Sequence, residues 1–265
     1  MTDALRRNNV RVTGESGRPM VMFAHGFGCS QEAWNLVAPR FEAGHRVVLF
    51  DHVGAGGSDS SAYVPSKYDS LDGYATDVLE ILEALDATDV VFVGHSVSAM
   101  IGVLAANRDP SRFKALVLVS PSPRYTDENG YRGGFRRSDI DAMMDALDAN
   151  YLGWSRVIAP AIVANPDRPA LGERLTDSFC SIDPTIARHF ARVTFLSDNR
   201  ADLPLVSVPT LVLQCRDDAI APEEVGRYVH AAIKESRFTL LNATGHVPNL
   251  SAPDEVADQI LAFVA

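Results

Sequence analysis

Short apolar runs rich in valine, leucine and phenylalanine recur along this chain, separated by segments with a helical period. Each run is apolar at nearly every position, which is typical of strands buried on both faces of a parallel sheet. The runs span residues 21–26, 46–51, 90–95, 115–120 and 210–215. Between two of them, one helical stripe of residues 70–86 carries Tyr74, Val78, Ile81, Leu82 and Leu85. Strands that alternate with helices predict an α/β fold, a doubly wound and mostly parallel sheet with right-handed crossovers.

The alternation stops near the middle of the chain. Residues 121–203 contain no convincing strand, but they show helical patterns at 137–163 and 186–198. We therefore expect a helical lid over residues 121–203, inserted into a core formed by residues 1–120 and 204–265.

After the lid, residues 237–246 are typical of a last strand and its loop, and residues 252–265 of a terminal helix. Ligands bind α/β proteins beyond the carboxyl ends of the strands. A lid over that edge of the sheet would shape a pocket.

Composition limits the partners and the location. The formal net charge of −10 argues against a nucleic-acid partner and against an anionic membrane surface. Cys29, Cys180 and Cys215 are far apart and odd in number, which predicts neither a disulfide framework nor a metal site. No apolar run approaches the ~18–20 residues that span a bilayer, and the N-terminal residues show no apolar signal core. We expect a cytoplasmic protein with no membrane partner and no metal.

A glycine-rich stretch at residues 50–61 follows a strand pattern, as a dinucleotide-binding loop would. That fingerprint requires G-x-G-x-x-G/A at the start of a helix. Here Gly54 and Gly56 are followed by Ser58 and Asp59 and then by a polar loop. We interpret the stretch as a tight turn whose backbone needs glycine, and not as a nucleotide site.

Residues 94–98, Gly-His-Ser-Val-Ser, lie between a strand pattern and a helix pattern. They fit the nucleophile elbow G-x-S-x-G, with Ser98 in place of the second glycine. The elbow serine sits on a strained turn that brings neighbouring backbones together, so the residues two before and two after must be small. The helix that follows points its N-terminus at Ser96, which favours developing negative charge there. An ordinary strand–turn–helix junction is the alternative interpretation.

A serine hydroxyl is a weak nucleophile without a base. His246 follows the last strand pattern in a Gly/Pro loop, where a base could reach Ser96; a surface histidine is the alternative. Asp217 and Asp218 directly follow another strand, and we prefer Asp218 as the orienting carboxylate because it begins a D-x-x-x-P turn. Capping of that turn is the alternative. The order of Ser96, Asp218 and His246 along the chain matches the Ser, Asp, His order of catalytic triads that follow a nucleophile elbow.

An acyl-transfer site also needs hydrogen-bond donors for an oxyanion. Residues 24–30, AHGFGCS, follow the first apolar run and form an HG-x-G loop. We expect the backbone N–H groups of Phe27 and Val97 to form the oxyanion hole, where removal of one donor typically costs ~10²–10³ in turnover. A plain turn at the strand end is the alternative.

These motifs resemble those of the α/β hydrolases over the whole length of the chain. More narrowly, the chain is similar to the RsbQ-like bacterial stress-response hydrolases and to their plant relatives, the strigolactone and karrikin receptors. The lid stretch 179–203 looks RsbQ-like, whereas GHSVSAM looks more like the plant receptors. The resemblance rests on AHGFGCSQEAW (24–34), DHVGAGGSD (51–59), GHSVSAM (94–100), NYLGW (150–154), DDAIAP (217–222) and GHVPNLSAPDE (245–255).

The resemblance implies a lid of four helices in a V over a mostly apolar pocket. It implies Ser96, Asp218 and His246 as the triad, Phe27 and Val97 as oxyanion donors, and no cofactor. It also implies a role in a stress sigma-factor pathway beside a PAS-domain phosphatase. Ordinary lid packing is the alternative for the side chains that we expect to line the pocket, which are Phe27, Phe135, Trp154, Ile158, Phe190, Val193 and Val247.

These expectations combine into a carboxylic-ester hydrolase that cleaves a small apolar ester or lactone through an acyl-enzyme. A serine in the elbow, where haloalkane dehalogenases and epoxide hydrolases carry aspartate, argues against those two classes. C–C bond hydrolysis and cofactor-free peroxidase chemistry share the triad and stay open. The alternative of another class is a signalling regulator or receptor, whose pocket binds a ligand, whose lid contacts a partner and whose hydrolysis is slow. A catalytically inactive homologue is the third.

Overall fold

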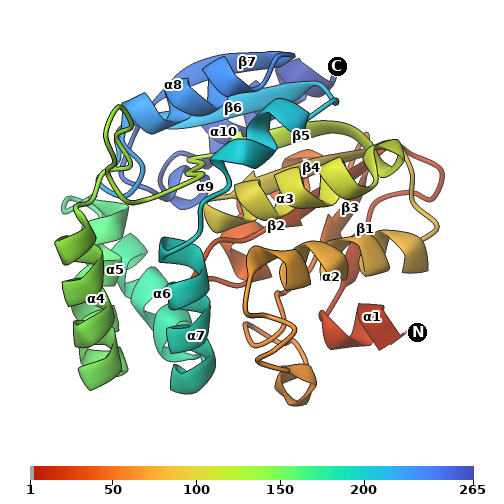
Figure 1. Ribbon diagram of the computed structural model, residues 1–265. Helices are drawn as coiled ribbons and strands as arrows, with labels where there is room; N and C mark the ends of the chain where they lie inside the picture. The colour runs from red at the N-terminus through yellow and green to blue at the C-terminus, as the bar shows by residue number, and fades with distance from the viewer. Residues whose placement is uncertain (1–2) are drawn as a thin grey trace.

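A seven-stranded sheet runs through the centre of the computed structural model, which describes residues 3–265 (Figure 1). The strand order is β1-β3-β2-β4-β5-β6-β7; β1 pairs antiparallel with β3, and the other neighbours are parallel. The expected doubly wound, mostly parallel sheet is confirmed, and Met1 and Thr2 of the expected core lie outside the described residues. The strands are β1 (Arg11–Thr13), β2 (Met20–Ala24), β3 (Arg46–Leu49), β4 (Val90–His95), β5 (Phe113–Val119), β6 (Thr210–Asp217) and β7 (Ser236–Thr244).

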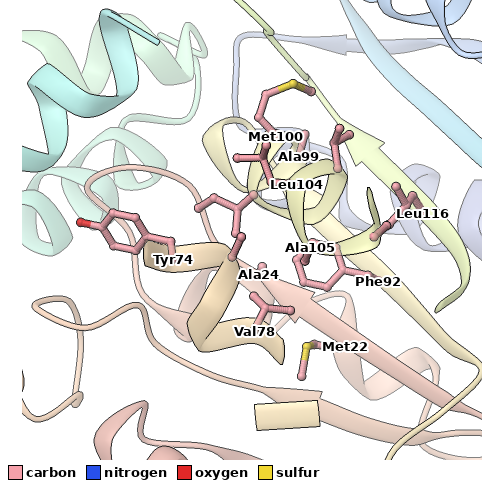
Figure 2. Close-up of a cluster of buried hydrophobic side chains, with 14 of the residues drawn as sticks. Met22, Ala24, Tyr74, Val78, Phe92, Ala99, Met100, Leu104, Ala105 and Leu116 are labelled. Atoms are coloured by element: carbon pink, nitrogen blue, oxygen red, sulfur yellow. The ribbon is translucent and has the colours of Figure 1, made fainter. Parts of the chain in front are cut away.

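Helices cover both faces of the sheet because alternate strand residues point to opposite sides. Met20, Met22 and Ala24 of β2 pack with α2 (Leu71–Ala84), α3 (Val97–Arg108) and α8 (Glu223–Ala232). Figure 2 shows this packing, in which Met22 and Phe92 of the sheet meet Val78 of α2 and Ala105 of α3. Val21 and Phe23 face the other way and pack with α10 (Pro253–Val264). The short α1 (Asp3–Arg7) lies against α2.

Four helices form the lid between β5 and β6: α4 (Arg137–Ala149), α5 (Tyr151–Val163), α6 (Pro169–Cys180) and α7 (Pro184–Phe195). They gather at one end of the sheet (Figure 1), with α5 packed against α6 and α4 against α7. The helical pattern at 137–163 is broken at Asn150, whose φ of −155° is not helical. The Asn150 side chain accepts a hydrogen bond from the Gly153 N–H, and this cap starts a new helix.

The glycine-rich stretch at 50–61 folds around a buried carboxylate. Asp51 accepts hydrogen bonds from the backbone N–H groups of Gln31 at 2.7 Å and Gly57 at 2.9 Å. Gly56 has a φ of 55°, and a Cβ there would lie 2.4 Å from Cγ of Asp51. Glycine is therefore required by this turn and its close approach to Asp51.

The last short helix, α9 (Pro248–Ser251), connects the loop after β7 to α10. None of the helices in residues 3–265 combines the length and apolar character that crossing a membrane requires.

Candidate active site

Four strands end at the same edge of the sheet, and each is followed by a residue singled out in the sequence. The HG-x-G loop follows β2, Ser96 follows β4, Asp218 follows β6, and His246 comes two residues after β7. Because these strands run parallel, their carboxyl ends meet beneath the lid. Ser96 and His246, which are 150 positions apart in the chain, thereby come into hydrogen-bond contact.

Ser96 lies on a sharp turn between β4 and α3. Its φ of 57° and ψ of −122° are unusual for a residue with a side chain. The Ser96 N–H donates to the carbonyl of Val119 in β5 at 2.8 Å, which fixes the turn to the sheet. A Cβ at Gly94 would lie 2.3 Å from the carbonyl oxygen of Ser98. This contact explains why the elbow needs glycine two residues before its serine.

Ser96, His246 and Asp218 form a hydrogen-bonded chain. Nε2 of His246 lies 2.7 Å from Oγ of Ser96, and Nδ1 of His246 lies 2.7 Å from Oδ2 of Asp218. The exposed fractions of the three residues are only 6%, 5% and 6%, in that order. The arrangement can move a proton from the serine hydroxyl to an imidazole that a carboxylate orients.

Asp218, and not its neighbour Asp217, carries this interaction. Oδ1 of Asp218 accepts the backbone N–H groups of Ile220 at 2.9 Å and Ala221 at 3.0 Å, which leaves Oδ2 for His246. Burial alone would raise the pKa of Asp218, but the His246 imidazole and the two N–H groups outweigh it and hold that pKa below its usual value. Asp217 ends β6 with an exposed side chain.

The backbone of His246 is fixed from two sides. Nε2–H of His95, in the elbow, donates to the His246 carbonyl at 2.8 Å. The His246 N–H donates to the carbonyl of Ile162 in α5 of the lid at 2.9 Å. Burial lowers the pKa of His95 to about 3, so its imidazole is neutral and holds its hydrogen on the nitrogen that donates.

The HG-x-G loop lies directly beside the elbow. A Cβ at Gly26 would lie 3.3 Å from Cβ of Ser96. Within residues 3–265, the N–H groups of Phe27 and Val97 make no hydrogen bond, and Val97 begins the 12-residue helix α3. Two free donors beside a serine at a helix N-terminus are suited to hold an oxyanion.

The His25 side chain orients the peptide that carries the Phe27 donor. Its Nδ1–H donates to the Gly26 carbonyl at 2.9 Å, and its Nε2 accepts the His52 N–H at 3.1 Å. The Gly26 carbonyl and the Phe27 N–H belong to one planar peptide unit. A bond that fixes the carbonyl therefore fixes the direction of the N–H.

A small cavity of about 30 Å³ adjoins Ser96. Its volume holds no more than about two water molecules. Apart from His95, Ser96 and His246, its walls are mostly apolar and come from the HG-x-G loop, the lid and the loops after β5, β6 and β7. These wall residues are Phe27, Cys29, Tyr125, Ile162, Leu175, Phe179, Thr194, Phe195, Ile220 and Val247.

The structure places two of the predicted pocket residues, Phe27 and Val247, on these walls. The other five, Phe135, Trp154, Ile158, Phe190 and Val193, lie outside them. Phe190 stacks on Tyr74 of α2 with ring centroids 4.5 Å apart, and Trp154 lies against Phe179 at 6.0 Å. Phe190 thus packs the lid against the core, whereas Trp154 packs two lid helices against each other. A lid helix is apolar toward the cavity and toward its neighbours alike, so the sequence pattern does not separate the two faces.

Sequence reasoning missed Tyr125, Phe179 and Phe195. Leu175 and Phe179 are four residues apart on α6, a spacing that could have indicated an inward face. Tyr125 lies in an irregular segment after β5, where no periodicity points to it. Burial raises the pKa of Tyr125 to about 12, so its hydroxyl stays protonated on the wall beside Ser96.

Comparison with known proteins agrees with this geometry. A strigolactone esterase from Arabidopsis thaliana is 38% identical over 94% of this chain and 93% of its own. A karrikin insensitive 2 receptor from Petunia hybrida is 36% identical over 97% and 95%. The solved structure of a hydrolase from Oleispira antarctica is 37% identical, with a TM-score of 0.96 over 99% of this chain and 96% of that one. The alpha/beta hydrolase family model matches residues 21–259, and the chain belongs to this family.

Proposed function

We propose that this hydrolase cleaves a small apolar ester or lactone through an acyl-enzyme on Ser96. One observation carries the proposal: Oγ of Ser96 and Oδ2 of Asp218 each lie 2.7 Å from a different nitrogen of the His246 ring. This geometry lets the imidazole take the serine proton on Nε2 while its Nδ1–H stays bonded to the carboxylate.

In the proposed reaction, Oγ of Ser96 attacks the carbonyl carbon while Nε2 of His246 takes the hydroxyl proton. The N–H groups of Phe27 and Val97 bind the oxygen that becomes negatively charged. When the tetrahedral intermediate collapses, His246 gives its proton to the leaving alcohol, which in a lactone stays attached to the acyl group. Water then attacks the acyl-enzyme with His246 as base, releasing the acid and restoring Ser96.

The substrate class follows from the walls of the cavity. Apart from the Tyr125 and Thr194 hydroxyls, the Cys29 thiol and the two histidines, the side chains around Ser96 are apolar. The ring of Phe27 packs edge-to-face against the rings of Phe179 and Phe195, with centroids 5.4 and 6.1 Å away. Such walls favour an uncharged, apolar acyl or alcohol group.

A panel of p-nitrophenyl esters and small lactones tests the proposal. We expect the wild type to hydrolyse short apolar members, and Ser96→Ala to lose about 10³-fold or more in kcat. A serine-directed fluorophosphonate should label Ser96, and His246→Ala should slow that labelling. Equal rates for the wild type and Ser96→Ala across the panel would refute the proposal.

A second candidate function is a ligand-responsive regulator in which hydrolysis is slow. It is supported by the resemblance to the petunia receptor and by the His246–Ile162 bond, which joins the base to the lid. A ligand that displaced His246 would thereby also displace α5. For this candidate we infer a cytoplasmic partner of the PAS-domain phosphatase type. Phosphatase binding that depends on the ligand, with ester turnover slower than the release of the phosphatase, would favour the regulator. Fast ester turnover without phosphatase binding would favour the enzyme.

A further inference from the structure

Ser98 stands where the elbow motif has its second glycine, and it is fully buried. Its Oγ donates to the His25 carbonyl at 2.5 Å and lies 2.7 Å from Nε2 of His52. His52 comes from the glycine-rich turn after β3, so three separate segments meet at this hydroxyl. A glycine at position 98 could make neither contact.

The hydrogen positions in this cluster follow from its acceptors. The His25 carbonyl can only accept, so it takes the single hydroxyl proton of Ser98. The Ser98 oxygen then accepts, which puts a hydrogen on Nε2 of His52 and leaves its buried Nδ1 bare. The His52 backbone N–H donates to Nε2 of His25, so the hydrogen of that ring is on Nδ1, facing the Gly26 carbonyl. Burial lowers the pKa of both imidazoles, which keeps them neutral.

These bonds fix two successive peptides of the HG-x-G loop. Ser98 holds the carbonyl of the peptide that joins His25 to Gly26. The His25 ring holds the carbonyl of the next peptide, which carries the Phe27 N–H. Because a trans peptide is planar and rigid, fixing both units sets the direction of that N–H.

We propose that Ser98 and His52 are positioning residues that aim the Phe27 N–H at the oxygen of the transition state. The inference rests on the proposed acyl-transfer function. Neither side chain lines the cavity. Their effect should therefore fall on the transition state and not on substrate binding.

The kinetic test compares Ser98→Ala, His52→Phe and the double variant with the wild type on the best p-nitrophenyl ester. Phenylalanine suits the site because the His52 ring is surrounded by Phe50, Tyr74 and Phe190. We expect kcat to fall about tenfold to a hundredfold in each single variant, with KM within about twofold. The double variant should lose no more kcat than the more impaired of the two single variants, because Ser98 and His52 belong to one chain of hydrogen bonds.

A matched control is Thr210→Val. It removes a buried hydroxyl that donates to the Val208 carbonyl at 3.1 Å, at the start of β6 and far along the sheet from Ser96. We expect its kcat to match the wild type at a comparable loss of Tm. If Thr210→Val loses as much kcat as Ser98→Ala, the effect is one of stability alone and the proposal is wrong.

A trifluoromethyl ketone, which forms a tetrahedral adduct on serine, separates positioning from binding. Its Ki should rise in Ser98→Ala by the factor that kcat/KM loses, while Ki for the product acid stays within about twofold. An unchanged Ki for the ketone would overturn the proposal.

The hydrogen-bond network can be tested without any activity. Nitrogen-15 NMR of the imidazoles should show His52 with its hydrogen on Nε2 and His25 with its hydrogen on Nδ1; the opposite tautomers would overturn the network. An absence of Ser96-dependent turnover in the wild type would refute the proposed function but leave this measurement decisive. Turnover that survives Ser98→Ala at full kcat would refute the positioning role alone.

Discussion

Ser96 has a strained backbone conformation that its neighbours hold in place. Its positive φ costs about 1–3 kcal/mol, which the surrounding structure must offset. The bond to Val119 in β5 and the close contact of Gly94 with the Ser98 carbonyl hold the turn from both sides. The strain raises the hydroxyl above the strand end, where His246 and the HG-x-G loop reach it.

Adjacent aspartates provide a matched test at the residue scale. Asp218→Asn keeps the shape of the side chain but cannot stabilise the His246 imidazolium that forms when Ser96 loses its proton. We expect kcat to fall on the order of 10³–10⁴-fold. Asp217→Asn alters an exposed side chain one position away and should leave kcat within about twofold. Steady-state rates of the two variants on one ester decide between them; equal losses would contradict the assignment of Asp218.

At the scale of elements, the loop after β7 depends on the C-terminus of α5. The His246 N–H donates to the Ile162 carbonyl, and Gly245, with a φ of 80°, packs against Val163. A Cβ at Gly245 would lie 2.0 Å from the Val163 carbonyl oxygen. The lid therefore does more than cover the cavity, because it holds the base in place.

Gly245→Ala should disturb this contact. The substitution adds about 1–3 kcal/mol of backbone strain and a collision that pushes His246 away from Ser96. Gly17→Ala is the control, because Gly17 has a φ of 84° and no atom within 4 Å of the added Cβ. Both variants should lower Tm, but only Gly245→Ala should lower kcat/KM, by about tenfold or more. Ester kinetics beside thermal unfolding check this; equal kcat/KM in the two would count against the lid's role.

At the scale of the whole molecule, buried histidines make the stability of the fold depend on pH. His25, His52 and His95 are all buried, and burial lowers the pKa of each, that of His95 to about 3. In the unfolded chain a histidine titrates near pH 6.5. Their contribution to the free energy of unfolding is therefore complete above about pH 6.5 and is lost as the pH falls below that value, for His95 down to about pH 3, because the unfolded state takes up protons first.

His95→Gln tests this account. Glutamine keeps an N–H donor for the His246 carbonyl but does not titrate. Each buried neutral histidine should cost about 1.4 kcal/mol of stability per pH unit within its window. The variant should therefore show a shallower fall in the free energy of unfolding between pH 6 and 4.5, by about that amount per unit. Urea unfolding at several pH values measures it, and an unchanged slope would contradict it.

Local chemistry allowed much of the fold and of the triad to be predicted from sequence. A buried strand must be apolar on both faces, and an elbow must have small residues beside its serine. These requirements make the runs at 90–95 and 210–215 and the sequence around Ser96 recognisable without coordinates. The edge strand β1 is three residues long with no buried position, so no apolar pattern in the sequence predicts it. The division of the lid pattern at Asn150 depends on one side-chain cap.

Ser96, Asp218 and His246 are marked by the sequence alone, because a serine nucleophile, its base and an orienting carboxylate each need a residue type at a strand end. The tertiary structure decided which of the apolar lid side chains face the serine, since Phe179 and Phe190 are equally apolar in sequence. It also gave Ser98 its role, by bringing the carbonyl of His25 and the ring of His52 to one hydroxyl. Such contacts join residues 46 and 73 positions apart, which no local pattern encodes, because only the packing of the sheet determines which loops meet.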